Sequence, residues 1–275
     1  MPSASIPVAF SPCPNDTFAF DAWVEKKIPS SIAINPVLAD IQQLNEWAYA
    51  AKFPVTKVST YCLGNITSKY VMLPVGAAIQ TGGGPKLIAK TSFASSEIKD
   101  KTVAVPGLDT TAYLLLRTLL PEPKKIVSAR YEEIPELVKN GSVDAGVIIH
   151  ETRFIFSRYG LVEIADLGTL FTDRCKSPLP LGVIVAQRSL GEEYIQEIST
   201  TLMRSVKYAQ AHKEITPFIL ASSQEKDLGV IHKHIDMYVT QETEKISARG
   251  VQALYVLFTH AINQKLLPKE ALNFL

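Results

Sequence analysis

A single histidine lies where an α/β sheet would place a reactive group. His150 follows the apolar run Val147-Ile148-Ile149, and the polar residues Glu151-Thr152-Arg153 come next. An unbroken apolar run is typical of a parallel strand buried on both faces, and open α/β sheets bind ligands outside the carboxyl ends of such strands. Because an ordinary imidazole has a pKa of about 6.5, His150 is a candidate general base at neutral pH. The alternative is a buried histidine that bonds to a carbonyl group.

The residues that follow the first expected strand, Ile6–Ser11, are also unusual. They read Pro12-Cys13-Pro14-Asn15-Asp16, and the two prolines deny helical conformation to the residues before them. We expect Asn15 or Asp16 to cap a helix over residues 17–26. Two prolines followed by Asn and Asp favour a binding role for Ser11, Asn15 and Asp16. The alternative is a rigid turn with no further role.

Two more groups of polar residues stand at the ends of expected elements. Lys57 and Ser59 close a strand over residues 54–59, where a cation would meet a carboxylate or hydroxyl group of a substrate. Asp109-Thr110-Thr111 caps a helix that runs to about residue 120, and the free amides of a helix start attract anions. The alternatives are a solvated charge for Lys57 and a purely structural cap for Thr110 and Thr111.

Strand and helix patterns alternate through two units of the chain. We expect the crossing between the units to lie between Gly82-Gly83-Gly84-Pro85 and the polar stretch Ser95–Asp100, and the strand at 181–186 leads back to the first unit. The later segments have only helical periodicity. The expected strands cover residues 6–11, 33–38, 54–59, 70–75, 102–105, 126–131, 145–149, 161–164 and 181–186, and the expected helices include 41–51, 111–120, 134–139 and 151–159.

This order of elements predicts an α/β, two-lobed, periplasmic-binding-protein-like (type II) fold with a ligand cleft between the lobes. Residues 1–92 and 188–275 are expected to form the larger, discontinuous lobe, which includes the C-terminal helices. Residues 93–187 are expected to form a smaller α/β lobe. The polar residues at strand and helix ends should then face one cleft.

The composition excludes several classes of partner. The 275 residues include 28 Lys and Arg against 27 Asp and Glu, a formal net charge of +1, so no basic surface for nucleic acid or an anionic membrane is expected. No apolar run approaches the roughly 18 residues that span a bilayer. The glycine-rich stretch matches no dinucleotide or phosphate motif. His232 and His234 would lie on different faces of a helix, which argues against a zinc site there.

The three cysteines, Cys13, Cys62 and Cys175, are widely spaced and form neither a metal motif nor a disulfide framework. Their number and spacing indicate a reducing compartment. The N-terminal residues 1–7 lack the features of a signal peptide. We therefore expect a cytoplasmic protein. No sequence neighbour of Cys13 lowers the pKa of its thiol, which disfavours a nucleophilic role for it.

Five short blocks of sequence resemble the 1,4-dihydroxy-6-naphthoate synthase family, which acts in the futalosine route to menaquinone. The resemblance extends from about residue 8 to the strand at 181–186 and is weaker in the helical tail. The blocks are Ser11–Phe18, Thr56–Ser59, Val105–Gly107 with Thr110–Tyr113, Ile148–Phe154 and Pro178–Gly182.

The resemblance implies a small-molecule carboxylate substrate, cyclic dehypoxanthine futalosine, which is converted to 1,4-dihydroxy-6-naphthoate and dihydroxyacetone. It implies no metal and no organic cofactor. The family's proton acceptor falls on His150. Its substrate contacts fall on Lys57, Val58 and Ser59 and on Thr111 and Ala112.

Two other functions fit a similar fold: chorismate dehydratase of the same pathway, and a solute-binding protein that closes on a ligand without chemistry. The Ser11–Phe18 block favours the naphthoate enzyme over the dehydratase, and the absence of a recognisable signal peptide argues against the solute-binding protein. The sequence leaves open whether the protein is a monomer or a dimer.

Overall fold

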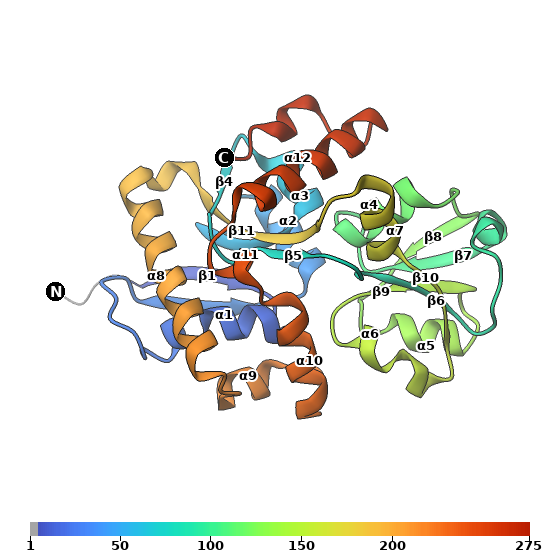
Figure 1. The fold of residues 1–275 in the computed structure, drawn as a ribbon, viewed down its shortest axis with the longest axis horizontal. Coiled ribbons are helices and arrows are strands. Elements are labelled where there is room, and N and C mark those ends of the chain that lie inside the picture. Colours follow the sequence, from blue (N-terminus) through green and yellow to red (C-terminus); the bar gives the residue numbers. More distant parts are fainter. Residues whose placement is uncertain (1–4) are drawn as a thin grey trace.

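A computed structural model describes residues 5–275 and shows two lobes, each built around its own β-sheet (Figure 1). Residues 1–4, which begin the stretch considered for a signal peptide, lie outside the described residues. The N-terminal strands and the C-terminal helices belong to one lobe, and the middle of the chain forms the other. The larger lobe is therefore built from two separate parts of the chain.

The larger lobe contains a six-stranded mixed sheet. Its order is β2-β1-β3-β11-β4, with β5 also paired to β11. Strand β1 runs parallel to β2 and β3, whereas β11 runs antiparallel to β3, β4 and β5. The carboxyl ends of β1 and β3 therefore meet at the same edge of the sheet. The strands are β1 (Ile6–Phe10), β2 (Ile34–Leu38), β3 (Val55–Ser59), β4 (Tyr70–Met72), β5 (Ala78–Gln80) and β11 (Leu179–Gln187).

Helices cover both faces of this sheet because its strands alternate apolar side chains to the two sides. On β11, Ile184 packs against α1 and α8, while Val183 and Val185 pack toward α3 and α12. The helices of this lobe are α1 (Pro14–Val24), α2 (Ile41–Tyr49), α3 (Thr60–Ile66), α8 (Glu192–His212), α9 (Pro217–Ser222), α10 (Leu228–Tyr238), α11 (Gln241–Glu244) and α12 (Ala248–Asn263), with short 3-10 turns η3 (Arg188–Leu190) and η4 (Lys269–Leu272).

Helix α1 begins earlier than the sequence suggested. Its N-cap residue is Cys13 and its first residue is Pro14, rather than a start after Asn15 or Asp16. Proline suits the first helical position because its fixed φ matches the helix and its missing N–H would have no partner there. The side chains of Asn15 and Asp16 are therefore free to make contacts other than capping.

The smaller lobe contains a five-stranded sheet of order β10-β6-β9-β7-β8. Strand β9, which leads to His150, is parallel to β7 but antiparallel to β6, so the expectation of a purely parallel strand was wrong on one side. The residues of β9 are nevertheless all buried. The elements are β6 (Lys86–Ala89), β7 (Thr102–Val105), β8 (Lys125–Ser128), β9 (Ala145–Ile148), β10 (Val162–Asp166), α4 (Thr111–Leu119), α5 (Ile134–Lys139), α6 (Thr152–Ile155), α7 (Leu167–Cys175), η1 (Ser95–Asp100) and η2 (Phe156–Tyr159).

The two crossings lie earlier in the chain than the expected boundaries after residues 92 and 187. Strand β6 already belongs to the five-stranded sheet, and β11 already belongs to the six-stranded one. The first crossing is thus the glycine stretch itself, where Gly84 packs against Gly168. A Cβ added at Gly84 would lie 2.8 Å from the Gly168 Cα, so the approach requires glycine. The polar stretch 95–100 is a 3-10 turn within the smaller lobe and not a linker.

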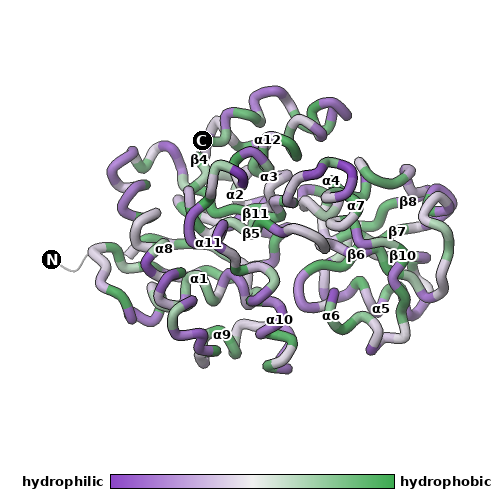
Figure 2. The backbone as a smooth tube through the Cα atoms, in the orientation of Figure 1, coloured by the Kyte–Doolittle hydropathy of each residue, from purple (hydrophilic) through white to green (hydrophobic). Residues whose placement is uncertain are grey.

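Hydrophobic segments run through both lobes, and many hydrophilic segments lie on the outer turns and helix ends (Figure 2). One core cluster continues from Val58 in the larger lobe to Leu87 and Val147 in the smaller one. Among residues 5–275, no helix is long and apolar enough to cross a membrane.

Candidate functional site

A cleft lies between the two lobes, and it gathers nearly all of the predicted site residues. Its walls include Ser11, Asn15, Asp16, Lys57, Ser59, Thr110, Thr111, Ala112 and His150. Val58 is the exception. Because successive side chains of a strand point to opposite faces, Val58 is turned from the cleft into the core, where it is fully buried.

The floor of the cleft is a buried hydrogen-bonded cluster around Asp16. Its carboxylate accepts hydrogen bonds from the Ser11 hydroxyl at 2.6 Å, from the Asn15 amide at 2.8 Å and from the Lys57 ammonium at 2.8 Å. Lys57 also donates to the Gly76 carbonyl oxygen at 3.2 Å. The positive charge of Lys57 is therefore already paired within the protein, which differs from the expectation of a free cation for the substrate.

Asn45, which sequence analysis missed, holds Ser59 in place. The Asn45 side-chain oxygen accepts from the Ser59 backbone N–H at 2.9 Å, and its amide donates to the Ser59 hydroxyl at 3.1 Å. The same amide lies 3.2 Å from the Asp109 carbonyl oxygen in the smaller lobe. A signal was present in the sequence, because Asn45 interrupts the apolar face that Leu44 and Ala48 form.

The start of helix α4 forms the opposite wall. The Thr110 hydroxyl accepts from the Tyr113 N–H at 3.2 Å and so caps the helix. The Thr111 hydroxyl donates to the Leu181 carbonyl at 2.8 Å and accepts from the Tyr61 N–H at 3.2 Å, which ties α4 to the larger lobe. The amides of the first helical turn have no partners within the helix, so this wall can receive an anionic group.

His150 stands at the end of β9 in a strained backbone conformation. Its φ is +56°, in the left-handed region that a non-glycine residue rarely adopts. Such strain is typical of residues that the surrounding structure holds for function. Among residues 5–275 the buried Nε2 atom has no hydrogen-bond partner, and the ring makes a T-shaped contact with Tyr131, with centroids 4.8 Å apart.

The pKa of His150 differs from the ordinary value that the sequence suggests. Burial lowers the pKa of His150 to about 4, although nearby Asp16 acts in the opposite direction. The imidazole is therefore neutral at physiological pH. A neutral imidazole can accept a proton, which is the state that a general base requires.

His234, in the helical tail, is a second histidine of the cleft. Its Nε2 is 2.8 Å from the Asn15 side-chain oxygen, and its Nδ1 is 3.9 Å from a carboxyl oxygen of Glu151. Sequence analysis considered His234 only as a zinc ligand and did not place it in the cleft. The signal was its position on the apolar face with Ile231 and Tyr238, where a polar residue needs a partner.

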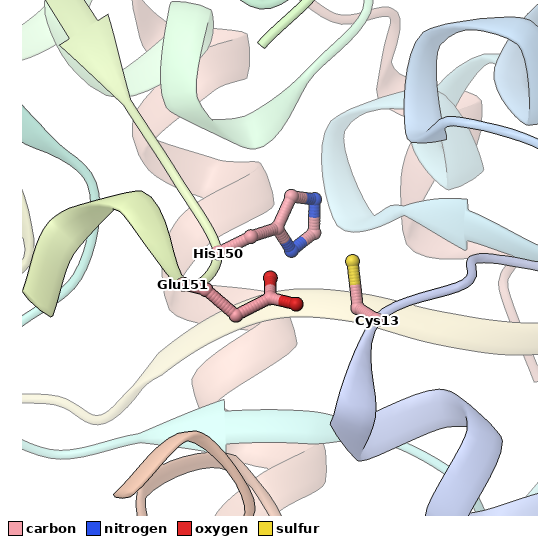
Figure 3. Close-up of side chains that lie close together, drawn as sticks. All are labelled: Cys13, His150 and Glu151. Carbon is pink, nitrogen blue, oxygen red and sulfur yellow. The ribbon is translucent and has the colours of Figure 1, made fainter. Parts of the chain in front are cut away.

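Cys13, His150 and Glu151 point toward one another between the lobes (Figure 3). One ligand atom of each lies within 4.8 Å of the others, an arrangement that could hold a metal ion if the thiol and the carboxyl group were ionised. Burial raises the pKa of Cys13 well above its ordinary value and raises that of Glu151 to about 7. The thiol thus stays protonated at neutral pH and the carboxyl group is only partly ionised, so this donor set is poorly suited to a metal.

Comparison with known proteins identifies relatives along almost the whole chain. Residues 6–263 match the family model described as "Menaquinone biosynthesis". A protein of Thermus thermophilus named 1,4-dihydroxy-6-naphthoate synthase is 41% identical over 255 residues, which is 92% of this chain and 93% of the relative. A Streptomyces coelicolor protein of the same name is 36% identical over 274 residues, covering 98% of this chain and 96% of the relative.

Solved structures show the same fold. A protein of Archaeoglobus fulgidus superposes with a TM-score of 0.89 at 30% identity, covering 96% of this chain and 98% of that one. The alkanesulfonate-binding protein of Xanthomonas axonopodis superposes with a TM-score of 0.71 at 14% identity, covering 98% and 96% of the two chains. The second likeness concerns the fold alone. Together they confirm the predicted periplasmic-binding-protein-like architecture.

Proposed function

Because this chain belongs to the menaquinone-biosynthesis family that includes the 1,4-dihydroxy-6-naphthoate synthases, we propose that it is a carbon–carbon lyase of the futalosine pathway. It converts cyclic dehypoxanthine futalosine to 1,4-dihydroxy-6-naphthoate and dihydroxyacetone. The observation that carries this proposal is the neutral imidazole of His150 on the wall of the interlobe cleft. A cleft of this kind suits a small aromatic carboxylate.

His150 acts as the general base. It removes a proton from a carbon next to a carbonyl group of the substrate, after which the adjacent carbon–carbon bond breaks and the new ring becomes aromatic. The departing fragment takes up the proton that the histidine holds, so the reaction needs no external acid and no oxidant. A positioned base of this kind typically contributes about 10²–10⁴-fold to the rate.

Hydrogen-bond donors of the cleft stabilise the carboxylate of the substrate and the oxygen that becomes negative during the reaction. The Ser59 hydroxyl accepts from Asn45, so its own O–H is free to donate to an oxygen that becomes negative. The first-turn amides of α4, at Thr111 and Ala112, receive the carboxylate of the substrate. Lys57 and Asp16 act together as a neutral pair that keeps the floor of the cleft polar. Val58 contributes only its backbone.

The reaction proceeds without a metal or an organic cofactor, because the base and the donors all come from this chain. The enzyme acts on a small molecule in the cytoplasm. Its three free cysteines suit a reducing compartment.

The direct test is incubation of the purified protein with cyclic dehypoxanthine futalosine, followed by mass spectrometry for both products. A parallel incubation with chorismate tests for the dehydratase, and a third incubation includes a chelator. We expect dihydroxynaphthoate and dihydroxyacetone in equal amounts, no reaction with chorismate and no effect of the chelator. Binding of the substrate without product would instead identify a solute-binding protein.

A further inference from the structure

The carboxyl group of Glu151 is buried beside the proposed base without a structural reason for its burial. Glu151 directly follows His150, is 2% exposed, and turns its side chain back toward the imidazole and Cys13 (Figure 3). Neither of its oxygens accepts a hydrogen bond of ordinary length among residues 5–275, although the nearby backbone N–H groups of Glu151 and Gln224 favour its ionised form. Burial of a carboxyl group without partners is costly, so a merely structural role would be better served by an apolar side chain.

Titratable groups from both lobes surround this carboxyl group. A Glu151 oxygen, a His150 ring nitrogen and the Cys13 sulfur are all within 4.8 Å of one another. On the other side, His234 Nδ1 lies 3.9 Å from Glu151 Oε2. His234 Nε2 is close to the Asn15 oxygen and carries the proton of that hydrogen bond, because the Asn15 amide nitrogen already donates to Asp16. The Nδ1 atom that faces Glu151 is then unprotonated.

We propose that Glu151 is the carboxylate partner of His150: its negative charge stabilises the imidazolium that forms when His150 takes a proton from the substrate. This inference deepens the proposed function and rests on it. Glu151 is a positioning residue, because it is absent from the walls of the cleft and acts through His150. The proton moves only between the substrate carbon, His150 and the departing fragment. Glu151 contributes only its negative charge and does not itself take up the proton.

The ionisation of Glu151 then governs the pH dependence of the base. The titratable and charged groups that face Glu151 are His150, Cys13, Tyr131, His234, Glu225 and Lys226. Burial raises the pKa of Glu151 to about 7 and lowers that of His150 to about 4. Across neutral pH the imidazole remains neutral, and the carboxyl group is the one that changes. As the pH rises through about 7, a carboxylate replaces the neutral acid and makes His150 a stronger base.

The test is the pH profile of kcat/KM between pH 5 and 9 for four proteins: wild type, Glu151→Gln, Glu151→Asp and Glu136→Gln. Glu136 is an exposed residue of α5 outside the cleft and serves as the matched control. In the wild type and the control, kcat/KM should rise about tenfold between pH 6 and 8, as a group with a pKa near 7 ionises. Glu151→Gln should be flat over this range and about tenfold or more slower at pH 8, with little change in KM. Glu151→Asp should restore the rise in part.

A Glu151→Gln profile that still rises near pH 7 would overturn the proposal. A second measurement covers the case in which this variant does not fold. In the wild-type protein with labelled histidine, the His150 ring resonances should shift with a midpoint near pH 7, as the neighbouring carboxyl group ionises. Resonances that do not move between pH 6 and 8 would also overturn it. Failure of the proposed function would look different from failure of this inference, because the wild-type protein would then show no turnover at any pH.

Discussion

The ammonium group of Lys57 lies 2.8 Å from the carboxylate of Asp16, and each side chain is at most 5% exposed. The pair joins the middle of strand β3 to the first turn of α1, and Ser11 and Asn15 complete the hydrogen bonding of the carboxylate. Removing one member of a buried pair leaves an uncompensated charge, whereas removing both leaves none. The pair thus fixes the relative position of two elements that line the cleft.

We expect Asp16→Asn to lower the free energy of unfolding by about 3–5 kcal/mol, because the Lys57 charge remains buried without its partner. The double variant Asp16→Asn/Lys57→Met should recover most of the stability but little of the activity. Urea unfolding measures the first effect and turnover the second. Lys139→Met, which breaks an exposed pair with Glu136, is the control and should change stability by less than about 1 kcal/mol. A similar small effect of Asp16→Asn would contradict a structural role for the pair.

Replacement of His150 with Asn isolates its proton-accepting role. Asparagine tolerates the left-handed backbone of residue 150, so the fold should be kept. Turnover should fall by about 10²-fold or more, while substrate affinity changes far less, because only the base is lost. Steady-state kinetics and calorimetric binding measure the two quantities. His212→Asn, on an exposed turn of α8, controls for the loss of an imidazole. Near-normal turnover of His150→Asn would remove the base from the mechanism.

Much of the larger lobe and half of the site follow from local sequence patterns. The apolar runs of β1 and β9 and the polar residues that follow them can be recognised without a structure, as can the extended pattern of β3. Because the carboxyl ends of neighbouring parallel strands meet at one edge, Ser11 and Ser59 could be predicted to converge. The cap at Thr110 is likewise a local signal, and the structure contains it.

The rest depends on contacts between distant parts of the chain. His234 reaches Asn15 across 219 positions, and no local pattern relates the two. The neutral state of His150 follows from its burial between the lobes, which no local pattern predicts. The direction of the β6–β9 pairing depends on where the chain crosses between lobes, and an extended segment such as Lys86–Ala89 fits either sheet. The side to which the Val58 side chain points could not be predicted either, because it depends on how β3 is aligned in the sheet.

The start of helix α4 provides a test of anion binding. Thr111→Pro should remove one amide donor without breaking the helix, because Thr110 already has the extended conformation (φ −87°, ψ 148°) that precedes proline. Thr111→Ala removes the same side-chain bonds to Leu181 and Tyr61 but keeps the amide, so it is the matched control. A charge-assisted hydrogen bond contributes about 1.5–3 kcal/mol. We expect Thr111→Pro to bind 2-naphthoate at least tenfold more weakly than Thr111→Ala, by calorimetry. Equal affinities would place the carboxylate elsewhere.

The ionisation of Glu151 should also change the free energy of unfolding with pH. Its pKa is raised from an ordinary value of 4.5 to about 7 by burial. Between these two values the folded protein holds a proton that the unfolded chain releases, so the contribution of Glu151 is present below pH 4.5 and is lost as the pH rises to about 7. The full loss is about 3 kcal/mol for a shift of this size.

Glu151→Gln stays neutral at every pH and does not suffer this loss. We therefore expect its free energy of unfolding to match that of the wild type near pH 4.5 and to exceed it by up to about 3 kcal/mol at pH 8. Urea unfolding at pH 4.5, 6 and 8 measures the difference, and Glu136→Gln should follow the wild type throughout. The same substitution is expected to slow catalysis at pH 8, since a carboxylate beside His150 is costly for the fold and useful to the base. Parallel stability curves for Glu151→Gln and the wild type would show that the carboxyl group is not held in its neutral form by burial.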